Sequence, residues 1–176
     1  MYNLGSAFPI ICYLNGELGD PTQLPPEISS LLFAQNRREG MLHIEDLYLR
    51  HGRHFLCDRY TGSNLSHQGA KVEGLERQRV IDWIKKIEFE DMGINRPDLT
   101  ILLDLPVEIA LEALRQRGEQ DGHEINEKYQ REVHETYLWL AETQPNWTVV
   151  NCMNRDSRKA VEEIAGEIWN VIKPII

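Results

Sequence analysis

Three short apolar runs, separated by long segments with helical periodicity, limit most strongly what this chain can fold into. The runs are 54–58, 99–104 and 147–152, and each is rich in bulky or β-branched residues without polar alternation. Such runs are typical of strands in a sheet that is covered on both faces. Strands that alternate with helices predict an α/β fold, with a mostly parallel sheet flanked by helices.

The remaining segments carry apolar residues at gaps of three or four, which predicts helices. The expected helices are 28–49, 75–92, 107–114, 126–141 and a last one from about residue 161 to Pro174. Proline and glycine predict a loop over 16–26 and a polar turn over 118–122. With 176 residues and no internal repeat, we expect a single domain over 1–176.

Charge and hydropathy limit the classes of partner. The chain has 19 Lys and Arg against 28 Asp and Glu, which gives a formal net charge of -9. A protein that coats nucleic acid normally has the opposite sign, so no nucleic-acid partner is expected. No apolar run approaches the ~20 residues that span a bilayer, and the first residues do not resemble a signal peptide. The expectation is a cytoplasmic protein with no membrane partner.

The cysteines favour neither a disulfide framework nor a zinc site. Cys12, Cys57 and Cys152 are an odd number, lie far apart and form no Cys-x-x-Cys pair. Cys57 and Cys152 lie within apolar runs, so both are expected to be small buried side chains.

The stretch 57–69 holds the densest set of chemically active residues. A strand that ends in Asp58 and Arg59 would present both at the carboxyl edge of the sheet, where α/β proteins bind ligands. An arginine there can present its planar fork to a phosphate, and the neighbouring aspartate can hold Mg2+ directly or through water. An ordinary surface pair of Asp58 and Arg59 above a loop is the alternative.

This stretch resembles the signature of the thymidylate kinase family: Asp-Arg-Tyr, a few polar residues, then an aromatic residue or histidine followed by Gln-Gly. The segment 31–39 resembles the family's helix with an aromatic residue and an arginine four positions apart, here Phe33 and Arg37, which share one helix face. Further likenesses are the segment that leads into the nucleotide pocket at Phe8-Pro9, and the next strand and lid helix at 97–117.

The resemblance implies a P-loop NTPase-like nucleoside monophosphate kinase fold. It also implies phosphoryl transfer from ATP, with Mg2+, to dTMP, which gives dTDP for dTTP biosynthesis. Such transfer depends on in-line positioning of two polyanions and on charge stabilisation rather than on covalent chemistry. The implied partners are dTMP and ATP, and members of the family are usually homodimers.

The resemblance also implies residue roles. Arg59 would grip the acceptor phosphate, and Asp58 would order Mg2+ or its waters. Arg115 and Arg117 would reach in from a lid at about 115–125 and stabilise the transition state, although two arginines near a helix end can also simply favour the helix dipole. The implied substrate contacts are Phe8, Pro9, Phe33 and Arg37 from the first third of the chain, then Ser63, Asn64, His67, Gln68, Asp121 and Glu124.

The family's first unit, a strand, a Gly-x-x-x-x-Gly-Lys-Ser/Thr loop and a helix, has no counterpart in this sequence. Because that loop cradles the ATP phosphates, we expect the thymidylate half of the site without the ATP half, and little kinase turnover. Two hypotheses follow: a thymidylate kinase whose sequence here lacks its amino terminus, or a non-catalytic nucleotide-binding relative that acts as a binding or regulatory module. A deoxynucleoside kinase of similar architecture is a third possibility.

Overall fold

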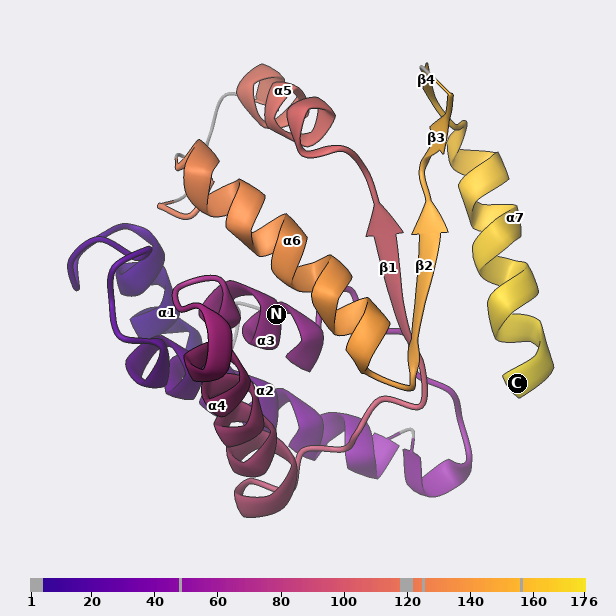
Figure 1. Cartoon of the computed structure of the whole chain (residues 1–176). Helices are drawn as coiled ribbons and strands as arrows, with labels where there is room; N and C mark the ends of the chain where they lie inside the picture. The colour runs from indigo at the N-terminus through magenta and orange to yellow at the C-terminus, as the bar shows by residue number, and fades with distance from the viewer. Residues whose placement is uncertain (1–4, 48, 118–121, 125, 156) are drawn as a thin grey trace.

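A computed structural model describes residues 5–47, 49–117, 122–124, 126–155 and 157–176 of the chain. In these residues the architecture is mixed α/β and mostly helical (Figure 1). The longer helices are α1 (Ala7–Leu14), α2 (Pro26–Leu47), α3 (Thr61–Gly69), α4 (Gly74–Lys85), α5 (Val107–Arg117), α6 (Glu127–Thr143) and α7 (Val161–Ile172). Short helical turns are η1 (Leu49–His51), the π-helix η2 (Lys86–Asp91) and η3 (Lys173–Ile175).

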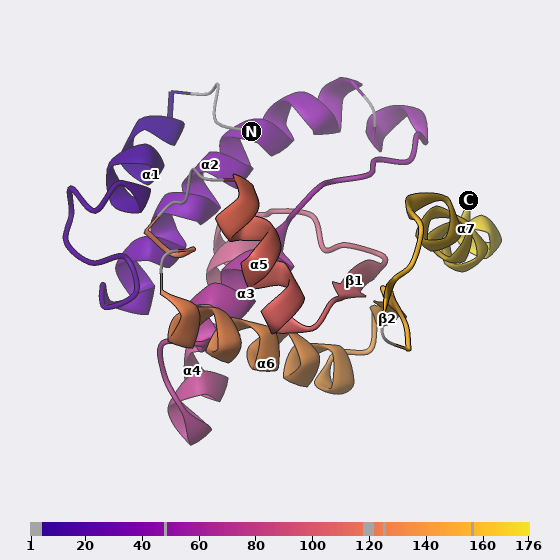
Figure 2. The ribbon, with the colours of Figure 1, turned by 90° about the horizontal axis from the view of Figure 1, so that it is seen from above.

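Two of the predicted strands form a parallel pair. Strand β1 (Thr100–Asp104) pairs with β2 (Trp147–Asn151), in a register that places Thr100 opposite Trp147 and Asp104 opposite Asn151. A short hairpin of β3 (Met153–Asn154) and β4 (Ser157–Arg158) follows. Helices α6 and α7 lie on opposite faces of the β1–β2 pair (Figures 1 and 2). The predicted α/β class, with a parallel sheet and flanking helices, is confirmed.

The third predicted strand, 54–58, is wrong. The chain there has no regular secondary structure, and Phe55 and Leu56 are 45% and 83% exposed. An apolar run becomes a strand only where a neighbouring strand completes its hydrogen bonds, and within the described residues β1 pairs with β2 alone. Cys57 is accordingly only part-buried, whereas Cys152 is buried as expected.

The predicted helices are present as α2, α4 with η2, α5, α6 and α7. Two further helices, α1 and α3, were not expected from periodicity. The main apolar core lies where α3, α4 and α6 meet, and its buried members are Leu65, Val80, Ile81, Ile84 and Leu140. Helix α3 therefore rests on the core with one side and faces α2 with another.

Helix α4 continues into a wider turn that contains a buried acidic residue. In η2 the backbone N–H of Met92 donates to the carbonyl of Ile87, five residues back, at 2.9 Å. Such a π-turn contains one residue more than an α-helical turn and is frequent at functional sites. Glu88, in this turn, is inside the protein with 0% exposure, and Gly93 at φ 63° follows the turn.

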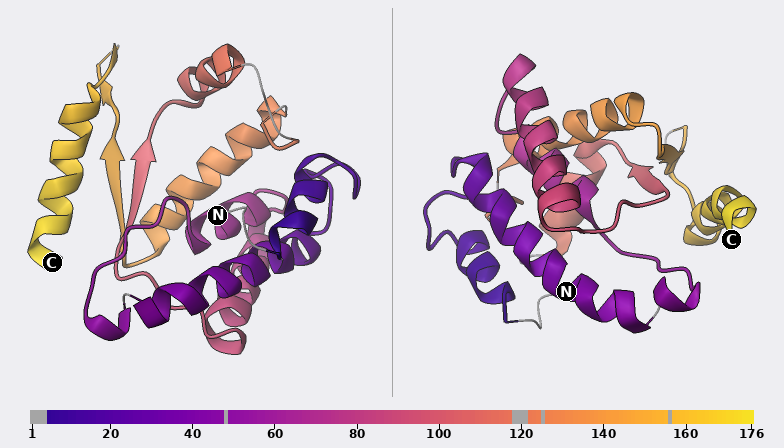
Figure 3. Two further views of the ribbon diagram at one scale, coloured as in Figure 1. Left: turned by 180° about the vertical axis from the view of Figure 1, so that it is seen from behind. Right: turned by 90° about the horizontal axis from the view of Figure 1, so that it is seen from below.

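Helix α2 lies at the opposite end of the molecule from α5 (Figures 1 and 3). Across the described residues, none of the helices is both long enough and apolar enough to cross a membrane.

Candidate functional site

The contact between α2 and α3 is unusually polar for a buried surface. On α3 the side chains of Thr61, Asn64, Ser66, His67 and Gln68 are all buried, although the helix carries few apolar residues. Polar groups are buried at a cost unless they have hydrogen-bond partners, so each of them needs a partner in the protein or in a ligand.

Glu88 is the charged centre of this contact. Its Oε1 accepts hydrogen bonds from Arg37 Nη1 at 2.8 Å and from Asn64 Nδ2 at 2.7 Å. Its Oε2 accepts from Thr61 Oγ1 at 2.7 Å. The Arg37 and Glu88 side chains are only 6% and 0% exposed, so this is a buried ion pair. The guanidinium of Arg37 also donates from Nη2 to the Tyr60 carbonyl, at 3.1 Å.

Four buried polar atoms around this ion pair have no hydrogen-bond partner among the described residues. They are Ser30 Oγ, Arg37 Nε, Asn64 Oδ1 and Gln68 Nε2. Ser30 and Arg37 are two turns apart on α2, while Asn64 and Gln68 are one turn apart on α3, so both pairs lie on facing sides of the two helices. Unpartnered buried polar atoms are rare in proteins, and a group of four is a place where a polar ligand or water can supply the hydrogen bonds.

An aromatic ring lies on the same face of α2. Phe33 is one turn before Arg37 and is part-buried, with the Tyr13 ring edge-on to it at a centroid distance of 5.9 Å. A flat apolar ring next to unpartnered donors and acceptors suits a planar heterocycle with a polar edge.

Arg59 lies at the N-terminal end of α3. Its backbone has φ 61°, a left-handed conformation that non-glycine residues adopt mainly in turns and at functional sites. Its Nε donates to Ser63 Oγ at 3.2 Å, and its Nη2 is 2.8 Å from His67 Nε2. The side chain thus stays at the protein surface beside the helix N-terminus, where anions bind favourably.

A buried cluster of rings closes the other end of α3. His67 stacks on His123 at a centroid distance of 4.9 Å, and Tyr13 Oη lies 2.6 Å from His123 Nε2. Tyr129 donates from its hydroxyl to the His67 carbonyl at 2.7 Å. Lys71 donates to Leu24 O, Tyr13 Oη and Ser29 Oγ, and burial lowers its pKa to about 8.

This environment makes His67 sensitive to acid. Burial, and then the nearby His123 and Arg59, holds the pKa of His67 well below its usual range. The unfolded chain binds a proton near the ordinary histidine pKa of about 6.5, while the folded chain does not. We therefore expect stability to fall as the pH drops below about 6.5, by up to about 1.4 kcal/mol per pH unit from this residue.

Urea unfolding at about pH 7 and pH 5 measures this loss, which should be clearly smaller in His67→Phe than in the parent chain. His54→Phe, at an exposed position, serves as the control and should retain the parent's dependence. Equal losses in the parent chain and in His67→Phe would show that His67 is not the acid-sensitive group.

Three other predicted site residues, Phe8, Pro9 and Arg115, lie outside the α2–α3 contact. Phe8 is 70% exposed on α1, with Pro9 beside it in the same helix. On α5, Arg115 is exposed and forms ion pairs with Glu112 and Glu127. Arg117 is the last residue of α5 and its side chain lies outside the described residues, as does all of Asp121. Glu124 is part-buried next to His123.

Asp58 is the residue expected to hold the implied Mg2+. It is exposed beside Arg59, and the described part of the chain contains no group of three or more Asp, Glu, His or Cys residues that could hold a metal. Mg2+ commonly uses one or two carboxylates and completes its shell with substrate phosphates and water. A single carboxylate thus fits an ion shared with a nucleotide.

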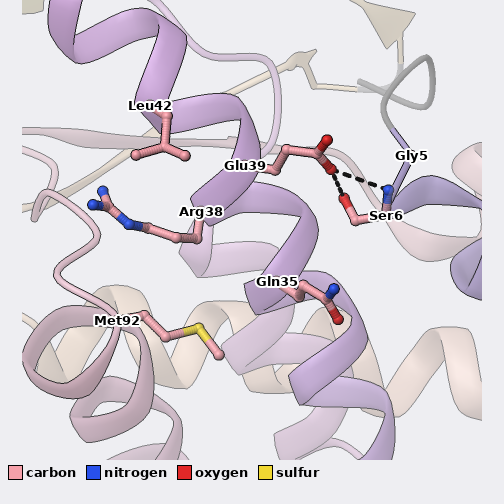
Figure 4. Close-up of a pocket in the computed structure, with 7 residues that line it drawn as sticks. All are labelled: Gly5, Ser6, Gln35, Arg38, Glu39, Leu42 and Met92. Carbon is pink, nitrogen blue, oxygen red and sulfur yellow. Dashed lines mark hydrogen bonds between the residues drawn. The ribbon is translucent and has the colours of Figure 1, made fainter.

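A hollow on another side of α2 does not coincide with this site. It has a volume of about 500 Å³ and is lined by Gly5, Ser6, Gln35, Arg38, Glu39, Leu42 and Met92 (Figure 4). Its charged groups already have partners, because Arg38 pairs with Glu45 at 3.0 Å and Glu39 accepts from the Ser6 N–H at 3.0 Å.

Comparison with known proteins identifies the family of this chain. Residues 13–164 match the family model described as thymidylate kinase. The chain belongs to the thymidylate kinase family. It is 33% identical over 154 residues to a probable thymidylate kinase of Pyrococcus horikoshii, covering 88% of this chain and 68% of the relative. It is 30% identical to a thymidylate kinase of Bradyrhizobium diazoefficiens, covering 85% and 64%.

A third relative, a thymidylate kinase of Limosilactobacillus fermentum, is 30% identical over 88% of this chain and 68% of its own length. The chain therefore spans roughly two thirds of the length of these thymidylate kinases. The α/β fold with its parallel strands is consistent with the P-loop NTPase-like fold of the family.

Several residues of the site are not identified by sequence patterns. Glu88 lies among charged residues from Lys85 to Asp91 and reads as one acid of a solvated helix. The one sign against that reading is that Glu88 follows the buried Ile84 by four residues, which puts both on the inward face of the helix. Lys71 offers a weak signal, since it follows His67 by one helical turn and so shares a face with it.

Proposed function

We propose that this protein binds dTMP between α2 and α3 and takes part in phosphoryl transfer from ATP to dTMP, which gives dTDP. Family membership supports the reaction class. The observation that supports the acceptor is the set of unpartnered buried atoms around the Arg37–Glu88 pair. The proposal includes one domain over 1–176 with a lid at about 115–125.

The chemistry of the unpartnered atoms matches the edge of a thymine ring. Arg37 Nε and Gln68 Nε2 are hydrogen-bond donors, while Asn64 Oδ1 is an acceptor. Thymine offers the complementary series along one edge: the O4 acceptor, the N3–H donor and the O2 acceptor. Cytosine has an amino group at C4 and an unprotonated N3, so two of the three contacts would oppose like groups. Phe33 would stack on the ring.

The phosphate of dTMP would then lie toward Arg59 and the first turn of α3. The guanidinium is at the surface, where its Nε donates to Ser63 Oγ and its Nη2 lies beside His67 Nε2, as given above. Helix N–H groups add favourable partial charge for an anion. Ser63 is also held by a hydrogen bond from Tyr137 Oη at 2.9 Å, which positions this end of the site.

The remaining roles concern the donor nucleotide. Asp58 would hold Mg2+ together with phosphate oxygens and water, and the ion would neutralise charge on the transferring group. Arg115 and Arg117 would approach from the lid. For Arg115 this means an exchange of exposed ion pairs with Glu112 and Glu127, which are weak in water.

Calorimetric titration of the purified chain with dTMP, and with dCMP as the matched competitor, tests the proposal. We expect dTMP to bind and Phe33→Ala to weaken binding by about 10- to 100-fold, the usual effect of removing an aromatic ring from a stacked base. Phe89→Ala, outside the site, should leave binding unchanged.

A folded sample that does not bind dTMP would contradict the proposal. An ADP-release assay with ATP, Mg2+ and dTMP on the same sample separates turnover from binding. Binding without turnover would favour the nucleotide-binding module over the kinase.

A further inference from the structure

Glu88 accepts hydrogen bonds from two residues of the proposed base site, Arg37 and Asn64, at the same time. A single oxygen, Oε1, accepts from Arg37 Nη1 and from Asn64 Nδ2, at 2.8 and 2.7 Å. The other oxygen is held by Thr61 Oγ1 at 2.7 Å. With both oxygens engaged and the side chain fully buried, the carboxylate has no freedom to rotate away.

For Arg37, these contacts fix the direction of the Nε–H donor. Nη1 is occupied by Glu88 and by the Phe33 carbonyl, and Nη2 by the Tyr60 carbonyl. Nε is the guanidinium nitrogen without a partner among the described residues. An oxygen acceptor satisfies it, whereas an amino group would bring two donors together.

For Asn64, the consequence is a fixed orientation of the amide. Its Nδ2 donates to Glu88 Oε1 and to the Ser30 carbonyl, at 2.7 and 3.2 Å, so its Oδ1 is the end that faces away from both. A carboxylate can accept but cannot donate, so it holds the amide in this orientation and not in the flipped one. The Oδ1 therefore remains an acceptor.

We propose that Glu88 is a positioning residue that sets the donor–acceptor order of the base site, and thereby selects 4-oxo pyrimidine nucleotides over 4-amino pyrimidine nucleotides. The inference rests on the proposed function. It adds that selectivity comes from a residue that need not touch the ligand, through Arg37 and Asn64. Glu88→Gln tests it, because the new amide has nearly the same shape but can donate as well as accept, so the Asn64 amide can turn over.

The experiment is calorimetric titration of the parent chain and of Glu88→Gln with dTMP, dUMP and dCMP. We expect the parent chain to prefer dTMP and dUMP over dCMP by about 100-fold or more, because a site built on buried hydrogen bonds rejects mismatched groups strongly. In Glu88→Gln we expect this ratio to fall at least 10-fold. Glu90→Gln, an exposed neighbour in η2, should keep the parent ratio.

The outcomes distinguish a failure of the proposed function from a failure of the inference about Glu88. If the parent chain does not bind dTMP, the proposed function fails. The inference fails if the parent chain binds dTMP selectively and a folded Glu88→Gln keeps the same preference for dTMP over dCMP with uniformly weaker affinity. Glu88 would then have only a structural role. If circular dichroism shows that Glu88→Gln does not fold, Thr61→Val is the second test, because it removes one hydrogen bond to the carboxylate. The inference requires that Thr61→Val also lowers the preference for dTMP over dCMP. An unchanged preference would overturn the inference.

Discussion

Replacing Arg37 with methionine is expected to abolish measurable dTMP binding and to lower the free energy of unfolding by about 3–5 kcal/mol. The substitution removes the proposed contact to the base. It also leaves the Glu88 carboxylate buried with 0% exposure and without its cationic partner. An uncompensated buried charge is among the most damaging consequences of a single substitution.

Two further variants separate these effects in urea unfolding and calorimetry. Arg38→Met, the next residue on α2, removes a part-exposed ion pair with Glu45 and should cost less than about 1 kcal/mol. The double variant Arg37→Met/Glu88→Gln removes both buried charges, so most of the stability should return while binding stays absent. A stable Arg37→Met single variant would contradict the buried-pair interpretation.

The second large effect is expected in the core beneath the site. Leu140→Ala should lower the free energy of unfolding by about 2–5 kcal/mol, because Leu140 is fully buried against the α3–α4 core. Leu65 of α3 is part of the same cluster, so the cavity would lie directly below the helix that carries Asn64 and Gln68.

Leu75→Ala is the matched control, since Leu75 is 82% exposed at the start of α4. Its effect should stay within about 0.5 kcal/mol. Equal losses in the two leucine variants, measured by urea unfolding, would mean that α6 does not support α3 as described.

The secondary structure could be predicted where local sequence decides it. The helices α2, α5, α6 and α7 follow from apolar residues at helical spacing, and β1 and β2 follow from uninterrupted apolar runs. The prediction failed at 54–58, because pairing with another strand is not a property of the run itself. Helix α3 was missed for the opposite reason: its two glycines and its Ser and Asn residues are poor helix formers, and packing against α2, α4 and α6 overrides them.

In the site, too, local sequence predicts some of the arrangement and long-range packing decides the rest. The spacing of Phe33 and Arg37 on one helix, and of Asn64 and Gln68 on another, already predicts that each pair shares a face. The structure brings the two faces together, which no local pattern contains. Glu88 and His123 come from segments far along the chain, and their burial depends on how η2 and residues 122–124 return to α3.

The direction in which Glu88 points depends on the number of residues between it and α4. Deleting residue 86 or 87 would move Glu88 one position closer to α4 and so turn it by about 100° around the helix axis, away from Arg37. The carboxylate would then be lost from the site although no side chain in it had been substituted. Discrimination between pyrimidines would thus depend on chain length within a single turn, and a change of one codon could reset it.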